Sequence, residues 1–229
     1  MIERSAGLTV AWGAVSLLLT IVLVFAVIRL LVDVPNITSG TLPEPDSFEY
    51  RYARYPWLAY LHIAPGVLYL LLAPLQLARG FRRRHIRLHR RAGRIAIVAG
   101  LIAGLAGGLF GLLFPFEGAL ESAASVVFGT WFVAALIAAY RAIRANDIAR
   151  HRRWMIRAFA IGVAVATIRL WIAAFEGSGL LTFRGSFGVA FWLAFLMHAL
   201  AAELWLRVRS SPVPSEAAGS RVKPSAGAT

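Results

Sequence analysis

The chain contains no cysteine, which excludes several kinds of chemistry at once. Disulfide bonds, thiol nucleophiles, iron–sulfur clusters and thiolate-held zinc all require cysteine side chains. Acidic residues are also scarce. The chain has 11 Asp and Glu and 24 Lys and Arg, which gives a formal net charge of +13. In a soluble protein this charge would suggest nucleic acid as a partner. Here the arginines are concentrated between apolar runs and lack aromatic readers around them, so no nucleic-acid partner is predicted.

The apolar composition excludes a soluble fold. Apolar residues make up 59% of the 229 residues, and the mean hydropathy is +0.69. Soluble domains average roughly 45–50% apolar residues. A helix needs about 20 mostly apolar residues to cross a bilayer, and six runs meet this requirement: 8–32, 57–78, 95–116, 123–143, 155–175 and 187–206. The first run exceeds the ~7–15 apolar residues of a secretory signal peptide, which indicates an uncleaved anchor.

The predicted fold class is therefore all-α, a six-span transmembrane helical bundle. Residues 1–207 are expected to form a single integral membrane domain. The remaining residues, 208–229, are rich in Ser, Pro, Ala and Gly. Such a composition cannot bury enough apolar surface to fold, so we expect a disordered tail.

Arginine is distributed unequally between the two ends of the apolar runs. Segment 79–94 carries eight arginines and segment 141–157 carries six. With the N-terminus and the C-terminal tail, these segments hold 19 of the 24 basic residues. Short cytoplasmic loops are enriched in Lys and Arg, so both segments and both termini are expected to be cytoplasmic. The external loops would then be 33–56, 117–122 and 176–186.

A short motif occurs twice, as His89-Arg90-Arg91 and as His151-Arg152-Arg153. Each copy follows an apolar run predicted to enter the cytoplasm and precedes one predicted to leave it. This repetition predicts two similar helical hairpins that form a four-helix core around a pseudo-twofold axis along the membrane normal. The first and sixth spans would flank this core. In the third span, glycines four residues apart (Gly100, Gly104 and Gly108) indicate close helix packing.

The two basic motifs are candidates for binding an anion at the membrane surface. Arginine offers a planar fork of donors to phosphate or carboxylate, and histidine donates or accepts depending on its tautomer. The alternative is that these arginines only set the orientation and attract anionic lipids loosely. The predicted ligand-binding residues here are His89, Arg90, Arg94, His151, Arg152 and Arg157, with Gln76 facing His89 across the first hairpin.

Two further candidates, His62 and Arg169, lie inside predicted spans. A charge at the centre of a spanning helix costs about 2.5–3.5 kcal/mol on translocon scales. At ~1.5 Å per residue, both lie less than about 10 Å from the external end, so they could face one polar cavity. Pro65 also leaves the carbonyl of Leu61 without its helical donor. The alternative is that Arg169 extends outward or pairs with an external carboxylate, the candidates being Glu117, Glu121 and Glu176.

Haem is an alternative ligand for the histidines. A b-type haem needs two imidazoles at similar depth on different helices, a condition that His89 and His151 meet. His62 and His198 differ in depth by about 12 Å, so they do not support a second haem. His85 and His89 share a helix face, but the surrounding arginines would repel a divalent cation. We therefore predict no other metal site.

Five sequence features together resemble a family of bacterial multi-pass membrane proteins catalogued as a domain of unknown function. They are a His followed by Pro-Gly (His62, Pro65, Gly66), P-x-Q (Pro74, Gln76), H-R-x-x-G-R (His89 to Arg94), H-R-R-W-M-I-R (His151 to Arg157) and T-x-R-L (Thr167 to Leu170). The resemblance covers about residues 57–175. It implies a bacterial plasma-membrane protein and carries no established activity.

The sequence thus favours binding or transport of an anionic small molecule or lipid headgroup at an Arg/His-lined site. A membrane redox protein that carries b-type haem or handles quinone is one alternative, and a structural or assembly protein is another. The expected partners are the lipid bilayer and its anionic lipids. Enzymatic activity and oligomeric state stay open at this stage.

Overall fold

The computed structural model describes residues 2–210, and every regular element within them is helical. Met1 and residues 211–229 lie outside the described residues, so most of the predicted disordered tail does too. In chain order the elements are α1 (Ile2–Ser39), α2 (Tyr50–Arg54), α3 (Pro56–Leu77), α4 (Arg79–Arg84), α5 (Ile86–Leu113), α6 (Ala119–Arg144), α7 (Ile148–Gly177), the 3₁₀ turn η1 (Arg184–Ser186) and α8 (Phe187–Ser210).

Six of these helices are long and apolar enough to cross a membrane, which confirms the predicted spans. They are α1, α3, α5, α6, α7 and α8. Several run beyond the apolar residues into the arginine-rich segments. Helix α7 begins at Ile148, where the carboxylate of Asp147 accepts a hydrogen bond from the backbone N–H of Arg150 at 2.8 Å. This N-cap, together with the good helix propensity of arginine, explains why the helix starts before its apolar stretch.

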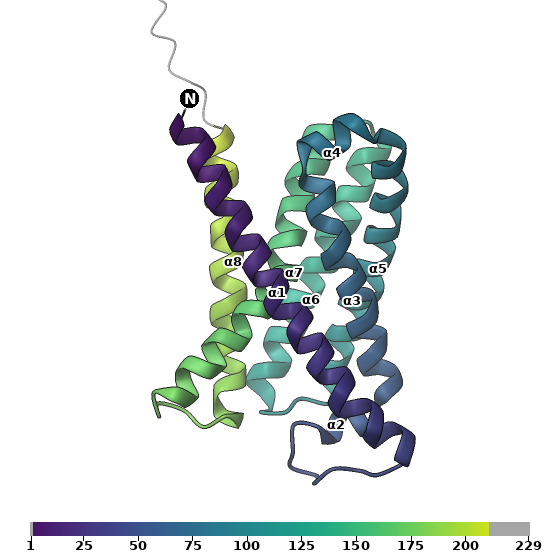
Figure 1. Ribbon diagram of the computed structural model, residues 1–229, viewed down its shortest axis with the longest axis vertical. Coiled ribbons are helices and arrows are strands. Elements are labelled where there is room, and N and C mark those ends of the chain that lie inside the picture. Colours follow the sequence, from purple (N-terminus) through teal and green to yellow (C-terminus); the bar gives the residue numbers. More distant parts are fainter. Residues whose placement is uncertain (1, 211–229) are drawn as a thin grey trace, which may run out of the picture.

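The bundle has a four-helix core, with α1 running obliquely across its front and α8 along one side (Figure 1). Helices α3 and α5 form one hairpin and α6 and α7 form the other, with α5 packed against α6 and α3 against α7. Helix α1 lies against α7 and α3, whereas α8 lies against α7 and α6. Within the described residues α1 and α8 do not pack against each other. This arrangement confirms the predicted pair of hairpins and their flanking spans.

Both ends of the bundle can be followed in Figure 1. The N-terminus, the last turns of α8 and the short helix α4 lie at one end, which we call the arginine-rich end. Helix α2 and the connection that precedes it lie at the other end, which we call the α2 end. This is the same-end arrangement of termini and basic loops that the arginine count predicts.

Glycines of α5 allow its neighbours to approach closely. A Cβ atom at Gly100 would lie 2.7 Å from Leu136 Cδ1, and one at Gly104 would lie 2.7 Å from Phe132 Cδ1. Gly129 of α6 crosses α5 at Gly108, since its own Cβ would lie 3.4 Å from the Gly108 Cα atom. The glycine spacing in the third span therefore serves close helix packing, as predicted.

The connection between α1 and α3 is more ordered than its proline content suggests. Phe48 and Tyr52 are buried in a second apolar cluster at the α2 end, together with Phe110, Phe116 and Phe187. The Phe48 ring lies 5.2 Å from the Phe187 ring and 5.3 Å from the Phe116 ring. The segment thus caps the bundle from the α2 end and brings charged side chains into it.

Candidate binding cavity

A cavity of about 240 Å³ lies in the middle of the bundle. Its wall is formed by residues of α1, α2, α3, α5, α6, α7 and α8, and most of that wall is apolar. The charged, tyrosine and histidine side chains among its lining residues are Arg29, Arg51, Tyr52, His62, Tyr69, Glu121 and Arg169. Several of them come from α2 and from the helix ends beside it, so the cavity has a charged end and an apolar remainder.

Arg51 forms a buried ion pair with Glu121 across the charged end. Its Nη1 atom donates to Glu121 Oε1 at 2.8 Å and to the carbonyl oxygen of Phe114 at 3.0 Å. Glu121 Oε2 accepts backbone N–H bonds from Phe116 at 2.7 Å and Glu117 at 2.9 Å. Glu121 is only 1% exposed. Both charges are therefore compensated, and the carboxylate ties the loop before α6 to α2.

Arg29 is compensated in a similar way from α1. Its guanidinium forms an ion pair with Asp33, one helical turn later, and its Nη1 atom lies 3.4 Å from Glu49 Oε1. The Tyr60 hydroxyl donates to Asp33 Oδ2 at 3.1 Å, which links α1 to α3. The guanidinium carbon of Arg29 lies 4.2 Å from the centre of the Tyr52 ring. Helix α1 is therefore held at the α2 end by a network of charged and aromatic side chains.

Arg169 differs from both because no carboxylate of the described chain pairs with it. Its guanidinium carbon lies 5.3 Å from the Phe25 ring centre and 5.7 Å from that of Phe48, and the Tyr52 side chain is its hydrogen-bonding neighbour. The sequence alternative of a pair with Glu121 does not occur, since Arg51 takes that carboxylate. Arg169 is therefore the one arginine of the cavity wall that no carboxylate of the described residues contacts.

His62 lines the same cavity as Arg169, and its ring orientation is fixed. The Nδ1 atom lies 2.8 Å from the carbonyl oxygen of Ala103. A carbonyl only accepts, so Nδ1 carries the proton, and in the neutral ring Nε2 is left as an acceptor. The ring sits against Gly107, where a Cβ atom would lie 2.4 Å from Nδ1. The glycine of α5 thus makes the space that the imidazole occupies.

Two polar atoms around the cavity have no hydrogen-bond partner within the described protein. They are the hydroxyl oxygen of Tyr69 and the Nε atom of Arg51. Tyr69 is 1% exposed and also lines the cavity. Buried polar groups are normally satisfied by protein or ordered water. These two groups are therefore available to a polar ligand atom or a water.

The other predicted site residues lie at the arginine-rich end. Gln76 Oε1 packs on Gly93, at 3.0 Å from where a Cβ atom would stand, and its buried Nε2 atom has no partner among the described residues. His89 and His151 are close enough to interact electrostatically. His151 Nδ1 donates to the Ala139 carbonyl at 2.9 Å. The structure brings the two imidazoles to one end, and haem ligation by them stays a prediction.

The predicted arginines do not form one cluster. Arg90, Arg94 and Arg152 are exposed side chains. Arg157 instead makes a two-pronged ion pair with Glu203 of α8, with Nε–Oε1 at 2.5 Å and Nη2–Oε2 at 2.9 Å. His198 of α8 lies 2.8 Å from the Thr167 hydroxyl of α7 through its Nε2 atom.

Sequence reasoning did not identify the residues that complete the charged end of the cavity. Arg29, Arg51 and Asp33 were not predicted to belong to a site, and Glu121 was considered only as a possible partner of Arg169. The available signal was that Arg29, Asp33 and Glu121 are charged residues within, or no more than two residues from, an apolar run, whereas Arg51 lies in the predicted external loop 33–56. Such residues are costly in a membrane and indicate a polar interior. Their partners could not be read from the sequence, because Arg51 and Glu121 are 70 residues apart.

Comparison with protein families gives one match. The family described as predicted membrane protein (DUF2306) matches residues 59–206. The chain belongs to this family. The matched region runs from the start of α3 nearly to the end of α8, and it leaves α1 and α2 outside. Neither the comparison with curated proteins nor that with solved structures found a match.

Proposed function

We propose that this integral membrane protein binds a small anionic amphiphile in the central cavity. The observation that carries the proposal is Arg169, a cation inside the bundle without a carboxylate partner in the described chain. Burying a charge is costly unless an opposite charge or strong hydrogen bonds compensate for it. A carboxylate or phosphate on the ligand would supply that charge, and the apolar remainder of the cavity would hold an apolar tail.

The other polar groups of the cavity support the same ligand class. Arg51 and Arg29 already hold carboxylates, so Arg169 is left as the cation that an anionic ligand group would pair with. The Tyr69 hydroxyl, which has no partner among the described residues, can donate to a ligand oxygen. A cavity of about 240 Å³ is at the small end for ligand sites, which favours a short-chain or compact ligand. Binding is therefore proposed for a single anionic group with a modest apolar body.

Arg169→Met is expected to weaken binding of decanoate at least about tenfold, corresponding to about 1.4 kcal/mol. It is also expected to leave the melting midpoint unchanged or raised, because an uncompensated buried charge is removed. Isothermal titration of purified protein in a neutral detergent measures the first effect, and a thermal melt measures the second.

Two comparisons make this test specific. Arg54→Met removes a charge from the exposed part of α2 at the same end of the bundle and should bind decanoate like the parent. Decanol, which has the same tail without the charge, should bind the parent weakly and the Arg169→Met protein no less tightly. Equal decanoate affinity for the parent and Arg169→Met would refute the proposal.

We further propose a location in the bacterial plasma membrane with the arginine-rich end in the cytoplasm, supported by the positive-inside bias. The cysteine-free chain allows single thiols to report on it. In intact cells, a membrane-impermeant maleimide should label Leu42→Cys, in the exposed connection at the α2 end. It should label Ala145→Cys, in the turn between α6 and α7, only after permeabilisation. The reverse pattern would contradict this orientation.

A further inference from the structure

A second concave site lies at the arginine-rich end, on the outside of the bundle between α7 and α8. Its volume is about 360 Å³. Its wall is formed by Arg150, Arg153, Trp154 and Arg157 of α7 and by Glu203, Leu206 and Arg207 of α8. Four arginines and one carboxylate therefore surround one groove, which we call the α7–α8 groove. It is separate from the central cavity, with which it shares no lining residue.

The single acid of the groove is already committed. Glu203 receives both prongs of the Arg157 guanidinium, at 2.5 and 2.9 Å. The guanidinium carbon of Arg157 lies 4.8 Å from the centre of the Trp154 ring. This cation–π contact and the ion pair link α7 to α8 along the groove. The charges of Arg150 and Arg153, both exposed, are not neutralised by Glu203 and give the groove a net positive charge.

The position of the groove matches the phosphate layer of a bilayer. It is made by the first turns of α7 and the last turns of α8, two helices long and apolar enough to span a membrane. Tryptophan prefers the membrane–water interface, and arginine pairs with phosphate through a planar fork of donors. Basic pockets between spanning helices at this level are suited to lipid headgroups.

We propose that the α7–α8 groove binds the phosphodiester headgroup of an anionic glycerophospholipid from the surrounding leaflet. Arg150 and Arg153 contact the phosphate, while Trp154 and Leu206 contact the first carbons of the acyl chains. The occupant is a lipid of the bilayer, whereas the central cavity is proposed to take a smaller ligand. The two proposals are independent, so Arg169→Met should leave the groove unaffected.

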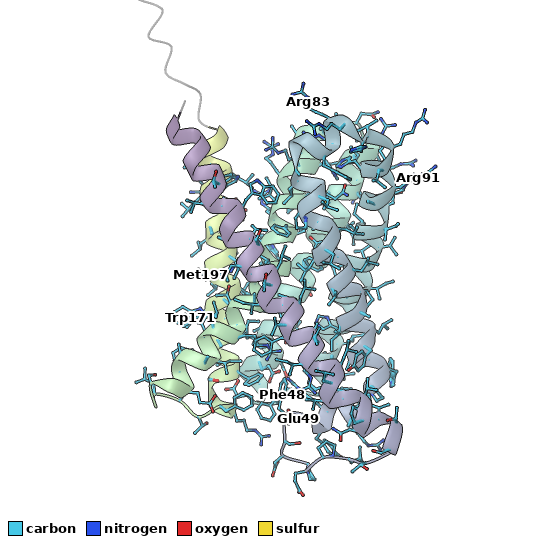
Figure 2. All side chains as sticks on the ribbon, viewed as in Figure 1. Phe48, Glu49, Arg83, Arg91, Trp171 and Met197 are labelled. Carbon is cyan, nitrogen blue, oxygen red and sulfur yellow. The ribbon has the colours of Figure 1, made fainter. Side chains whose placement is uncertain are left out.

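Exposed arginines elsewhere at the same end provide a matched control. Figure 2 shows Arg83 and Arg91 there, on α4 and α5, and both are exposed. Arg150→Gln/Arg153→Gln and Arg83→Gln/Arg91→Gln remove the same charge from one end of the molecule. Only the first pair lines the groove. A loss confined to that pair would separate a built site from general surface charge.

The experiment is native mass spectrometry of the full chain released from nanodiscs that contain phosphatidylglycerol and phosphatidylcholine. We expect the parent and Arg83→Gln/Arg91→Gln to retain phosphatidylglycerol equally. We expect Arg150→Gln/Arg153→Gln to retain it at least about tenfold less, because two basic residues that attract the anionic headgroup are lost. Unchanged melting midpoints for both variants would show that the fold is intact.

Three results would overturn the proposal. One is an equal loss in the two double variants, which would mean unspecific surface attraction. Another is equal retention of phosphatidylcholine and phosphatidylglycerol by the parent. The third is complete displacement of phosphatidylglycerol by about 10 mM inorganic phosphate, a concentration that saturates a weak anion site. This result would indicate a site for free phosphate.

Discussion

Glu121→Ala is expected to destabilise the folded protein by about 3–5 kcal/mol, the usual cost of leaving one partner of a buried ion pair without the other. The variant leaves Arg51, a residue only 8% exposed, without its carboxylate. It also removes the acceptor of two backbone N–H groups, those of Phe116 and Glu117. The shift of the unfolding midpoint in detergent, followed by circular dichroism, measures this effect.

Asp46→Ala is the control for this prediction. Its carboxylate pairs with Arg184 at 3.4 Å, but the Asp46 side chain is 94% exposed. Solvent screens such pairs, so the midpoint should hardly move. If the two variants shift the midpoint by similar amounts, the Arg51–Glu121 pair does not hold the α2 end together as the structure indicates.

Gly107→Leu is expected to destabilise the protein by ~3 kcal/mol, at the upper end of the usual cost of overpacking. A Cβ atom at this position would lie 2.4 Å from His62 Nδ1 and 2.6 Å from its Cε1 atom. The ring cannot turn away without losing the hydrogen bond to the Ala103 carbonyl. Helices α3 and α5 would have to separate. A lowered midpoint, together with lost decanoate binding, is the expected readout.

Gly13→Leu provides the comparison within the same chain. Nothing lies within 4 Å of a Cβ atom at Gly13, which is an exposed position of α1. Leucine has the higher helix propensity, so stability should be unchanged or slightly increased. If Gly13→Leu lowered the stability as much as Gly107→Leu, the loss at Gly107 would not come from the clash with His62.

The sequence predicted the architecture well because a bilayer restricts the possible folds. Only helices satisfy their own backbone hydrogen bonds across a membrane, so six apolar runs translate directly into six helices. The errors were at the boundaries. Helix α1 continues to Ser39 and α7 begins at Ile148, since polar residues at a helix end remain helical where water or a cap satisfies them.

Counting residues from the helix ends was also informative for the cavity. His62 and Arg169 were expected at similar depth, and both line the cavity of the structure. The sequence could not show which acid pairs with which base. Arg51 reaches Glu121 from the short helix α2, which lies inside the predicted external loop 33–56. That pairing depends on how the connection folds back over the bundle, and long-range folding of this kind leaves no periodic signal.

Part of the cavity wall comes from a helix outside the family match. Val22, Phe25, Ala26 and Arg29 of α1 line the cavity, whereas the matched region begins at residue 59. The four-helix core holds together through contacts among α3, α5, α6 and α7. The family match therefore covers the scaffold of the cavity, while the part of the wall that α1 supplies belongs to a segment outside the shared region.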